Sequence, residues 1–347
     1  MKNRLQLLVK LSIISVYLIF IAGSVVRMTG SGMGCPDWPK CFGYYIPPTS
    51  ETQITWQANK SYEKGMIIIK DETLFVAQND VTTAASFNPS NWEKYTKHDY
   101  AKFNKYHTWT EYINRLASVL AGFVFLFLIV SASQYWNSDK RIPLLAYGAF
   151  LLMLFEAWLG KTVVDTNLKP TIITIHMVAG LVIVALLLYL HFIINPSTEN
   201  NRKYNALFNK LLIVSVVFSL IQIAMGTQVR QFIDEQVKQF GFANKEYSLM
   251  DPNFKFYFHR SFTIAIVLVN LGMFYLNQIK NLGYQLVNWI VFLIFLETIT
   301  GILMYYAEFP LGTQATHLLA GALLFGLQFY LWLQSKKPAK AIETTQS

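Results

Sequence analysis

The sequence predicts an all-α membrane protein: eight transmembrane helices form two tandem four-helix bundles, with a small β-rich insertion in an external loop. Composition is the first observation behind this prediction, because hydrophobic residues make up 53% and charged residues 14% of the 347 positions. Apolar runs are the second, because several reach about 20 residues, enough for a helix to cross about 30 Å of hydrocarbon. An internal repeat is the third, and it divides the helices into two sets of four.

The apolar runs are expected to be helices, since none shows the short alternating pattern of an outer-membrane strand. They cover residues 9–28, 110–134, 143–163, 171–194, 207–229, 257–278, 284–306 and 312–334. The first run has a cationic start, so a cleaved signal peptide is the alternative. However, Gly23 to Arg27 at its outer end matches Gly226 to Arg230 at the outer end of the fifth run, which favours a retained helix.

Lysine and arginine concentrate in alternate connections, and this sets the orientation. They lie before the first span, after the second, fourth and sixth spans, and in the tail: Lys2, Arg4, Lys10, Lys140, Arg141, Arg202, Lys203, Lys210, Lys280, Lys336, Lys337 and Lys340. Both termini are therefore expected in the cytoplasm. The expected location of the protein is a bacterial cytoplasmic (inner) membrane, where lipid surrounds the helices. This topology explains the net charge of +9, so no nucleic-acid partner is expected.

The repeat carries residues with chemical potential. In two helix pairs a Glu lies 20 residues and a Gly 16 residues before a His: Glu156, Gly160 and His176, then Glu297, Gly301 and His317. Asn114-Arg115 in the second span likewise aligns with His259-Arg260 in the sixth. Four is an even number, so both units have one orientation. We expect residues 1–28 and 106–196 to form the first unit, 197–335 the second, and 336–347 a cytoplasmic tail.

The spacing between the copies places an insertion in the external loop 29–105. Equivalent residues are 203 positions apart in spans one and five but 145 apart in spans two and six, so the first copy is 58 residues longer there. Residues 56–97 alternate apolar and polar positions between turn signals, as a small β module does. Their aromatic spacing faintly resembles small carbohydrate-binding modules, but short aromatic strands are common, so a plain structural insertion is the preferred interpretation.

Three of the six histidines lie at one depth, near the external ends of their spans: His176, His259 and His317. An imidazole inside a bilayer is costly unless it is paired or bound to a metal. A neutral histidine bonded to a neighbouring helix explains any single one, but the repeat favours ligands. Zinc sites need three or four close N or S ligands, whereas each half offers at most two histidines on different helices, which suits a haem iron.

Four arginines lie near the same outer boundary, two in each unit: Arg27, Arg115, Arg230 and Arg260. Their guanidinium groups could pair with haem propionates. Interfacial snorkelling explains them equally well, and the sequence does not decide between the two.

The two units differ opposite the repeated histidine. His317 is expected to face His259, whereas His176 faces Asn114, and asparagine is a poor iron ligand. This difference predicts electron transfer in one unit and chemistry on a bound molecule in the other.

Only the first unit has a carboxylate, Glu111, one turn outward from Asn114; the second unit has Phe256 there. Placing a carboxylate near the membrane core costs free energy, so Glu111 is expected to have a role. Proton transfer and stabilisation of a reactive intermediate are the two roles considered. The alternative is a structural ion pair with Arg115, four residues further along the helix.

Taken together, these segments resemble the haem A synthase family. The similarity rests on Thr29 to Cys41 after the first span, Glu111 to Arg115, Phe258 to Arg260, and the His-x-x-Ala-Gly segments at His176 and His317. It covers essentially all eight spans and leaves out the insertion at residues 50–100.

The resemblance implies an enzyme that oxidises the C8 methyl group of haem O to a formyl group by successive hydroxylations. It implies a b-type haem cofactor in the second unit, and a substrate-haem site in the first unit with Glu111 as catalytic residue. His259 and His317 would ligate the cofactor iron near Arg230 and Arg260, and His176 the substrate iron near Asn114, Arg115 and Arg27. A haem O synthase and an aa3-type oxidase assembly line are the implied partners; the electron donor is not identified.

Asn114 departs from the family pattern, which has a histidine there. His107 could replace that ligand only if the haem or the helix shifts, because seven residues of helix span about 10 Å. The preferred hypothesis leaves His176 as the only axial ligand, with the opposite face open beside Asn114 and Glu111. His98 and His191 are assigned no role.

Cys35 and Cys41 are expected outside the membrane, where a close pair can form a disulfide. A structural staple is the preferred interpretation, whereas the resemblance implies a redox-sensitive loop over the substrate site. Trp38 between them could cap that site or anchor the loop at the interface.

Two functions of other classes stay open. One is a diheme protein that passes on electrons from quinol, and the other is a haem carrier or oxidase-assembly factor without catalysis. Glu111 in only one unit argues against symmetric electron transfer, whereas Asn114 favours the non-catalytic alternatives.

Overall fold

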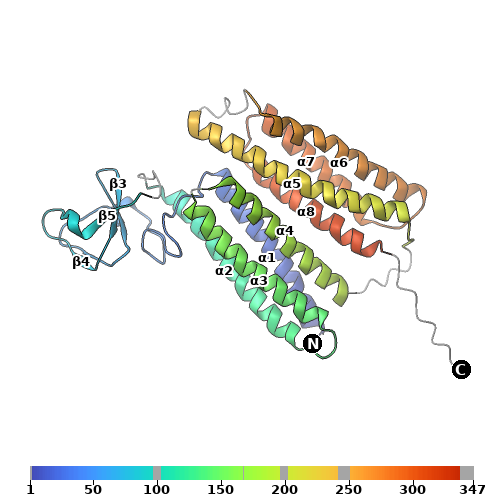
Figure 1. The fold of residues 1–347 in the computed structure, drawn as a ribbon, viewed down its shortest axis with the longest axis horizontal. Coiled ribbons are helices and arrows are strands. Elements are labelled where there is room, and N and C mark those ends of the chain that lie inside the picture. Colours follow the sequence, from blue (N-terminus) through green and yellow to red (C-terminus); the bar gives the residue numbers. More distant parts are fainter. Residues whose placement is uncertain (1, 97–102, 167, 196–201, 241–250, 337–347) are drawn as a thin grey trace.

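A computed structural model describes residues 2–96, 103–166, 168–195, 202–240 and 251–336. Two helical bundles lie side by side, and a small β module projects from one end of the first (Figure 1). The helices are α1 Lys2–Met28, α2 Lys105–Ser133, α3 Arg141–Asp165, α4 Pro170–Ile194, α5 Ala206–Phe240, α6 Phe254–Ile279, α7 Leu286–Tyr306 and α8 Thr313–Gln334. Within the described residues all eight are long and apolar enough to cross a membrane, so the predicted fold class is confirmed.

The helices extend past several predicted spans. The α1 helix begins at Lys2 where the apolar run begins at 9, and α5 ends at Phe240 where the run ends at 229. Apolar pattern marks only the lipid-crossing part of a helix, so polar turns beyond it are missed. The earlier start of α2 has a local cause, since the Asn104 side chain accepts hydrogen bonds from the backbone N–H groups of Tyr106 and His107.

Each unit closes on itself as a four-helix bundle. In the first, α1 packs on α2 and α4, and α3 packs on both α2 and α4; α5 to α8 repeat this arrangement. Phe125 and Leu187 are fully buried in the first core, and Phe208 and Met273 in the second. The units meet along α1, α4, α5 and α8. At this boundary Leu181 of α4 packs with Ala322 and Phe325 of α8.

Large apolar side chains cover the outside of both bundles. Phe127, Leu151, Leu268 and Phe295 are more than half exposed although each lies within a long apolar helix. A continuous apolar belt of this kind fits lipid as the surrounding solvent. The structure therefore bears out a multi-pass membrane protein.

The β module between α1 and α2 contains two small antiparallel sheets. Strands β1 Ser61–Tyr62 and β4 Val81–Thr82 form one, and β2 Ile67–Lys70, β3 Thr73–Ala77 and β5 Trp92–Lys94 form the other in the order β2-β3-β5. The short 3₁₀ helices η1 Glu51–Gln53 and η2 Pro89–Asn91 flank them. The expected β-rich insertion is thus present, although its predicted end at 97, like His98, lies outside the described residues.

The module has two apolar clusters. In one, Tyr62 and Trp92 meet edge to face and are 2% and 7% exposed, so these aromatic residues serve as core. In the other, Ile54 and Ile67 pack with Cys41 of the loop that follows α1. The module and that loop therefore share a core.

Candidate functional site

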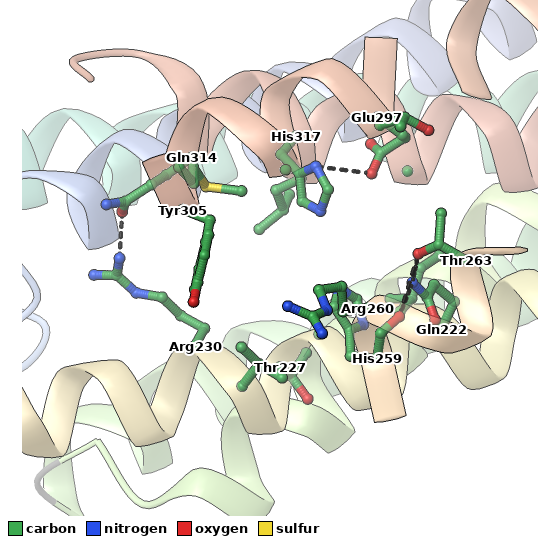
Figure 2. A pocket seen from close by; sticks show the side chains of 18 of the residues that line it. Gln222, Thr227, Arg230, His259, Arg260, Thr263, Glu297, Tyr305, Gln314 and His317 are labelled. Atoms are coloured by element: carbon green, nitrogen blue, oxygen red, sulfur yellow. Dashed lines mark hydrogen bonds and ion pairs between the residues drawn. The ribbon is translucent and has the colours of Figure 1, made fainter. Parts of the chain in front are cut away.

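Two imidazoles face each other across a cavity in the second bundle. His259 of α6 and His317 of α8 have ring centroids 6.4 Å apart and planes inclined by 71° (Figure 2). The cavity between them has a volume of about 340 Å³. Because metal–imidazole bonds are about 2 Å long, this separation suits one metal atom between the two rings.

His317 is held by polar groups behind it. Its Nδ1 lies 3.0 Å from a Glu297 carboxylate oxygen and 3.0 Å from the Thr300 hydroxyl. These contacts leave the other ring nitrogen directed towards the cavity (Figure 2). Ligating histidines in proteins are commonly oriented by such a carboxylate partner.

The glycines of the repeat lie against the imidazoles. A Cβ at Gly301 would lie 3.7 Å from Cε1 of His317, and one at Gly160 would lie 4.0 Å from Cε1 of His176. Gly226 is closer still, since its Cβ would lie 3.2 Å from Cε1 of His259. The glycines of the repeat therefore lie where the imidazole ring packs against the neighbouring helix, and they have no side chain to crowd it.

Three of the four predicted arginines line this one cavity: Arg27, Arg230 and Arg260. Arg230 bonds to the Gln314 side chain and lies 2.8 Å from Asp234. Arg260 lies over the Tyr257 ring at 5.2 Å and has no acid partner among the described residues. Figure 2 shows its guanidinium directed into the cavity between His259 and Arg230.

Arg27 requires a correction. Its position in the first unit suggested the substrate-haem site, but its guanidinium lies 3.1 Å from Asp234 of α5 and lines the second-unit cavity. Arg230 also donates to the Arg27 carbonyl oxygen at 3.2 Å. The helix ends of the two copies therefore meet at the boundary between the units, where sequence spacing alone could not place them.

The first-unit residues occupy equivalent places. His176 Nδ1 pairs with Glu156, as His317 pairs with Glu297. A Cβ at Gly23 would lie 3.8 Å from Oδ1 of Asn114, so Asn114 lies against α1 as His259 lies against α5. Asn114 Oδ1 is buried with no hydrogen-bond partner among the described residues.

Glu111 is almost completely buried, at 3% exposure, and both of its oxygens are engaged. One accepts the backbone N–H of Cys35 at 2.9 Å, and the other pairs with Arg115. The ion pair that the sequence left open is therefore present.

Arg115 also donates to three carbonyl oxygens of the loop after α1, at 2.8 Å to Asp37, 3.0 Å to Lys40 and 3.4 Å to Cys35. Its guanidinium is used to hold that loop. The predicted place of Arg115 at the substrate haem stays a prediction.

The loop itself is closed by a disulfide between Cys35 and Cys41, which confirms the predicted pairing. Inside it, Asp37 accepts the backbone N–H groups of Phe42 and Gly43 at 2.6 and 2.8 Å. Burial raises the pKa of Asp37 above its usual value, against the opposing effect of these hydrogen bonds. A Cβ at Gly34 would lie 2.4 Å from the carbonyl oxygen of His107, so the loop docks closely on the first turn of α2.

Sequence reasoning missed four polar residues around the second-unit cavity: Gln222, Asp234, Thr300 and Gln314. Thr300 and Gln314 each lie three residues from a predicted site residue, so helical spacing could have found them. Asp234 lies four residues after Arg230, but the predicted span ended at residue 229, so helical spacing was not expected to continue there. Among the described residues, no group of three or more His, Cys, Asp or Glu side chains is placed to hold a bare metal ion.

Comparison with known proteins agrees with this arrangement. Residues 6–76 and 81–329 match the family described as cytochrome oxidase assembly protein, COX15-CtaA, and the match runs through most of the insertion that the resemblance had left out. A heme A synthase of Shewanella oneidensis is 21% identical over 97% of this chain and 99% of its own length. Heme A synthases of Alkalihalophilus pseudofirmus and of Wolbachia pipientis subsp. Culex pipiens are 23% and 25% identical, over 98% and 89% of this chain and 100% and 90% of theirs. The chain therefore belongs to the COX15-CtaA family of cytochrome oxidase assembly proteins.

Proposed function

We propose that this protein is a haem A synthase, which oxidises the C8 methyl group of haem O to a formyl group. The observation that carries the proposal is the inequality of the two equivalent sites: one has two facing imidazoles, and the other has one imidazole, an asparagine and a buried carboxylate nearby. Relatives that are similar over nearly their full length are named heme A synthase.

The second-unit site fits a b-type haem. The 6.4 Å between the His259 and His317 centroids suits an iron between them, and the glycines leave space beside the rings. A cavity of about 340 Å³ lies within the range of cofactor pockets. When bound, the haem supplies one-electron redox chemistry through its iron.

The protein's own charges orient that haem. Arg230 and Arg260 line the cavity, and Arg260 has no competing acid among the described residues, so it is the guanidinium that pairs with a propionate. Arg230 pairs with Asp234, which also pairs with Arg27, and it lines the cavity without a free charge. Glu297 holds His317 from behind and keeps its ligating nitrogen towards the cavity.

The first-unit site holds the substrate haem through His176, with Glu156 as its orienting partner. The amide oxygen of Asn114 is buried and has no hydrogen-bond partner among the described residues. In this proposal Asn114 faces the other side of the haem and leaves that side open to water or oxygen. Glu111 lies one turn outward and has no acidic counterpart in the second unit, where Phe256 stands. Its carboxylate takes up and returns protons during the two hydroxylations, while Arg115 and the Cys35 N–H hold its oxygens in place.

The expected setting is a bacterial cytoplasmic membrane with both termini inside. Haem O delivered by a haem O synthase is the proposed supply, and assembly of an aa3-type oxidase the proposed destination. The external disulfide loop then lies on the outer side of the membrane, over the entrance to the first-unit site.

Analysis of the bound haem tests the proposal against its rivals. The full-length protein is expressed with a source of haem O, and the extracted haem is identified by mass. Haem A or its hydroxylated intermediate supports the synthase. Unchanged haem O would instead support a carrier or an electron-transfer protein, which Asn114 in place of a ligating histidine also favours.

Replacing Glu111 separates chemistry from cofactor binding. We expect Glu111→Gln to abolish haem A formation while the low-spin spectrum of the second-unit haem persists, because Glu111 lies in the other bundle. Product analysis and absorption spectroscopy of the same sample measure the two effects. Loss of both would show that Glu111 is needed for folding, through its contacts with Arg115 and Cys35.

A further inference from the structure

The second-unit cavity contains two buried polar atoms of complementary type without partners. Nδ1 of His259 and Oε1 of Gln222 both lack a hydrogen bond within the described part of the chain. The Gln222 amide is nevertheless fixed beside this histidine. Its Nε2 donates to the His259 carbonyl oxygen at 3.0 Å and to the Thr263 hydroxyl at 2.9 Å (Figure 2).

An imidazole that binds a metal through one nitrogen normally donates the N–H of the other to an acceptor. His317 has such an acceptor in Glu297, at 3.0 Å. His259 has none among the described residues, although the oxygen of Gln222 is an acceptor on the adjacent helix. The terminal torsion of a glutamine is soft, but a full turn of the Gln222 amide would break its two hydrogen bonds, so a bridging water reaches Nδ1 with less disturbance.

The repeat gives an independent observation. The position equivalent to Gln222 in the first unit is Ile19, and the position equivalent to His259 is Asn114. The unit with the second imidazole therefore has the amide, and the unit without that imidazole has an apolar residue instead. If the glutamine served only to join α5 to α6, its presence would not be expected to depend on whether the unit has the second imidazole.

We propose that Gln222 is the positioning residue of the His259 ligand: its Oε1 accepts the Nδ1–H of His259 in the haem-loaded protein, directly or through one water. This inference rests on the proposed haem site. It makes the two axial imidazoles unequal, since His317 is backed by a carboxylate and His259 by a neutral amide.

This inequality has a defined electronic effect. An acceptor at Nδ1 makes the imidazole a stronger donor to iron and thereby stabilises the ferric state. Removal of the Gln222 oxygen moves the midpoint potential of the second-unit haem to more positive values, and a carboxylate at the same place moves it to more negative values. Loss of such a partner typically weakens metal-site affinity about 10–100-fold.

The test compares full-length wild type with Gln222→Leu, Gln222→Glu and Gln231→Leu. Gln231 is the matched control, because it is a glutamine of the same helix that does not line the cavity, and its amide bonds to Glu235. The low-spin electron paramagnetic resonance signal reports the bis-imidazole haem, redox titration gives its potential, and transfer to apomyoglobin gives its rate of loss.

The expected result is opposite shifts of potential in the Leu and Glu variants, with haem loss at least about 10-fold faster in the Leu variant and no change in the control. An unaltered potential in both variants overturns the proposal. Equal defects in Leu and Glu also overturn it, because a carboxylate cannot donate to the His259 carbonyl and a merely structural role would fail in both. A wild type without a low-spin haem signal refutes the proposed haem site itself.

Discussion

At the scale of single residues, one side chain separates the two sites. Asn114 and His259 occupy equivalent places against glycines of α1 and α5, yet only the imidazole can bind iron strongly. The Glu-Gly-His pattern identified the scaffold from sequence alone, because glycine contacts and carboxylate partners repeat at fixed helical spacing. It could not reveal that Glu111 is already bonded on both oxygens, since Cys35 lies 76 residues away in sequence.

The exchange of Asn114 for histidine tests this difference. We expect Asn114→His to give the first unit a second axial imidazole and so a second low-spin haem signal, with loss of haem A formation because the open face is filled. Paramagnetic resonance and product mass measure the two effects. The reciprocal change His259→Asn should remove the low-spin signal of the second unit, and an Asn114→His protein with an unaltered signal would contradict the assignment.

Gly34 allows a second prediction for a single residue. Its Cβ would lie 2.4 Å from the His107 carbonyl oxygen, so Gly34→Ala should cost about 1–3 kcal/mol of stability by overpacking the contact between the loop and α2. Gly122→Ala is the control, because nothing lies within 4 Å of its Cβ and the added methyl group favours helix. Thermal unfolding in detergent compares the two, and equal midpoints would show that the contact contributes nothing.

At the scale of elements, the extra turns of α5 are the main departure from the sequence prediction. Apolar periodicity ended this span at residue 229, but the helix continues to Phe240 and brings Asp234 between Arg27 and Arg230. The eight spans themselves were predictable, because each must satisfy its backbone within the bilayer. The contacts between helices could not be predicted, because they depend on which helix ends lie together in the fold.

The α5 extension can be tested through its carboxylate. We expect Asp234→Leu to lower stability by about 1.5–3 kcal/mol, because two guanidinium groups lose a charged hydrogen-bond partner. Glu235→Leu is the control on the same helix, since its exposed carboxylate contacts only Gln231 among the described residues. Unfolding midpoints in detergent that agree between the two variants would exclude this role for Asp234.

At the scale of the whole molecule, two similar bundles share one boundary. The α1, α4, α5 and α8 helices form that boundary, and the arginine of each copy reaches across to the other. Hydropathy and repeat spacing predicted two bundles in one orientation. They could not predict the pairing of Arg27 with the second unit, which follows from the packing of α1 near α5.

Removal of the disulfide tests how the loop that it closes supports the first unit. Opening the six-residue separation between Cys35 and Cys41 should cost about 2 kcal/mol by loop entropy. We expect the double change to serine to loosen the loop and to reduce haem A formation, while the low-spin haem of the second bundle is unaffected. Full activity of the double variant would assign the disulfide to stability alone.

The common core of the β module and the disulfide loop has a consequence for protein engineering. Ile54 and Ile67 of the module pack on Cys41. The backbone N–H of Cys35 in turn donates to Glu111, near the start of α2. A chimera that exchanged only the strands with those of a relative would cut through this packed unit. Its junctions belong instead before Gly34 and after Arg115, so that the loop, the module, Glu111 and the arginine that holds the loop are transplanted together.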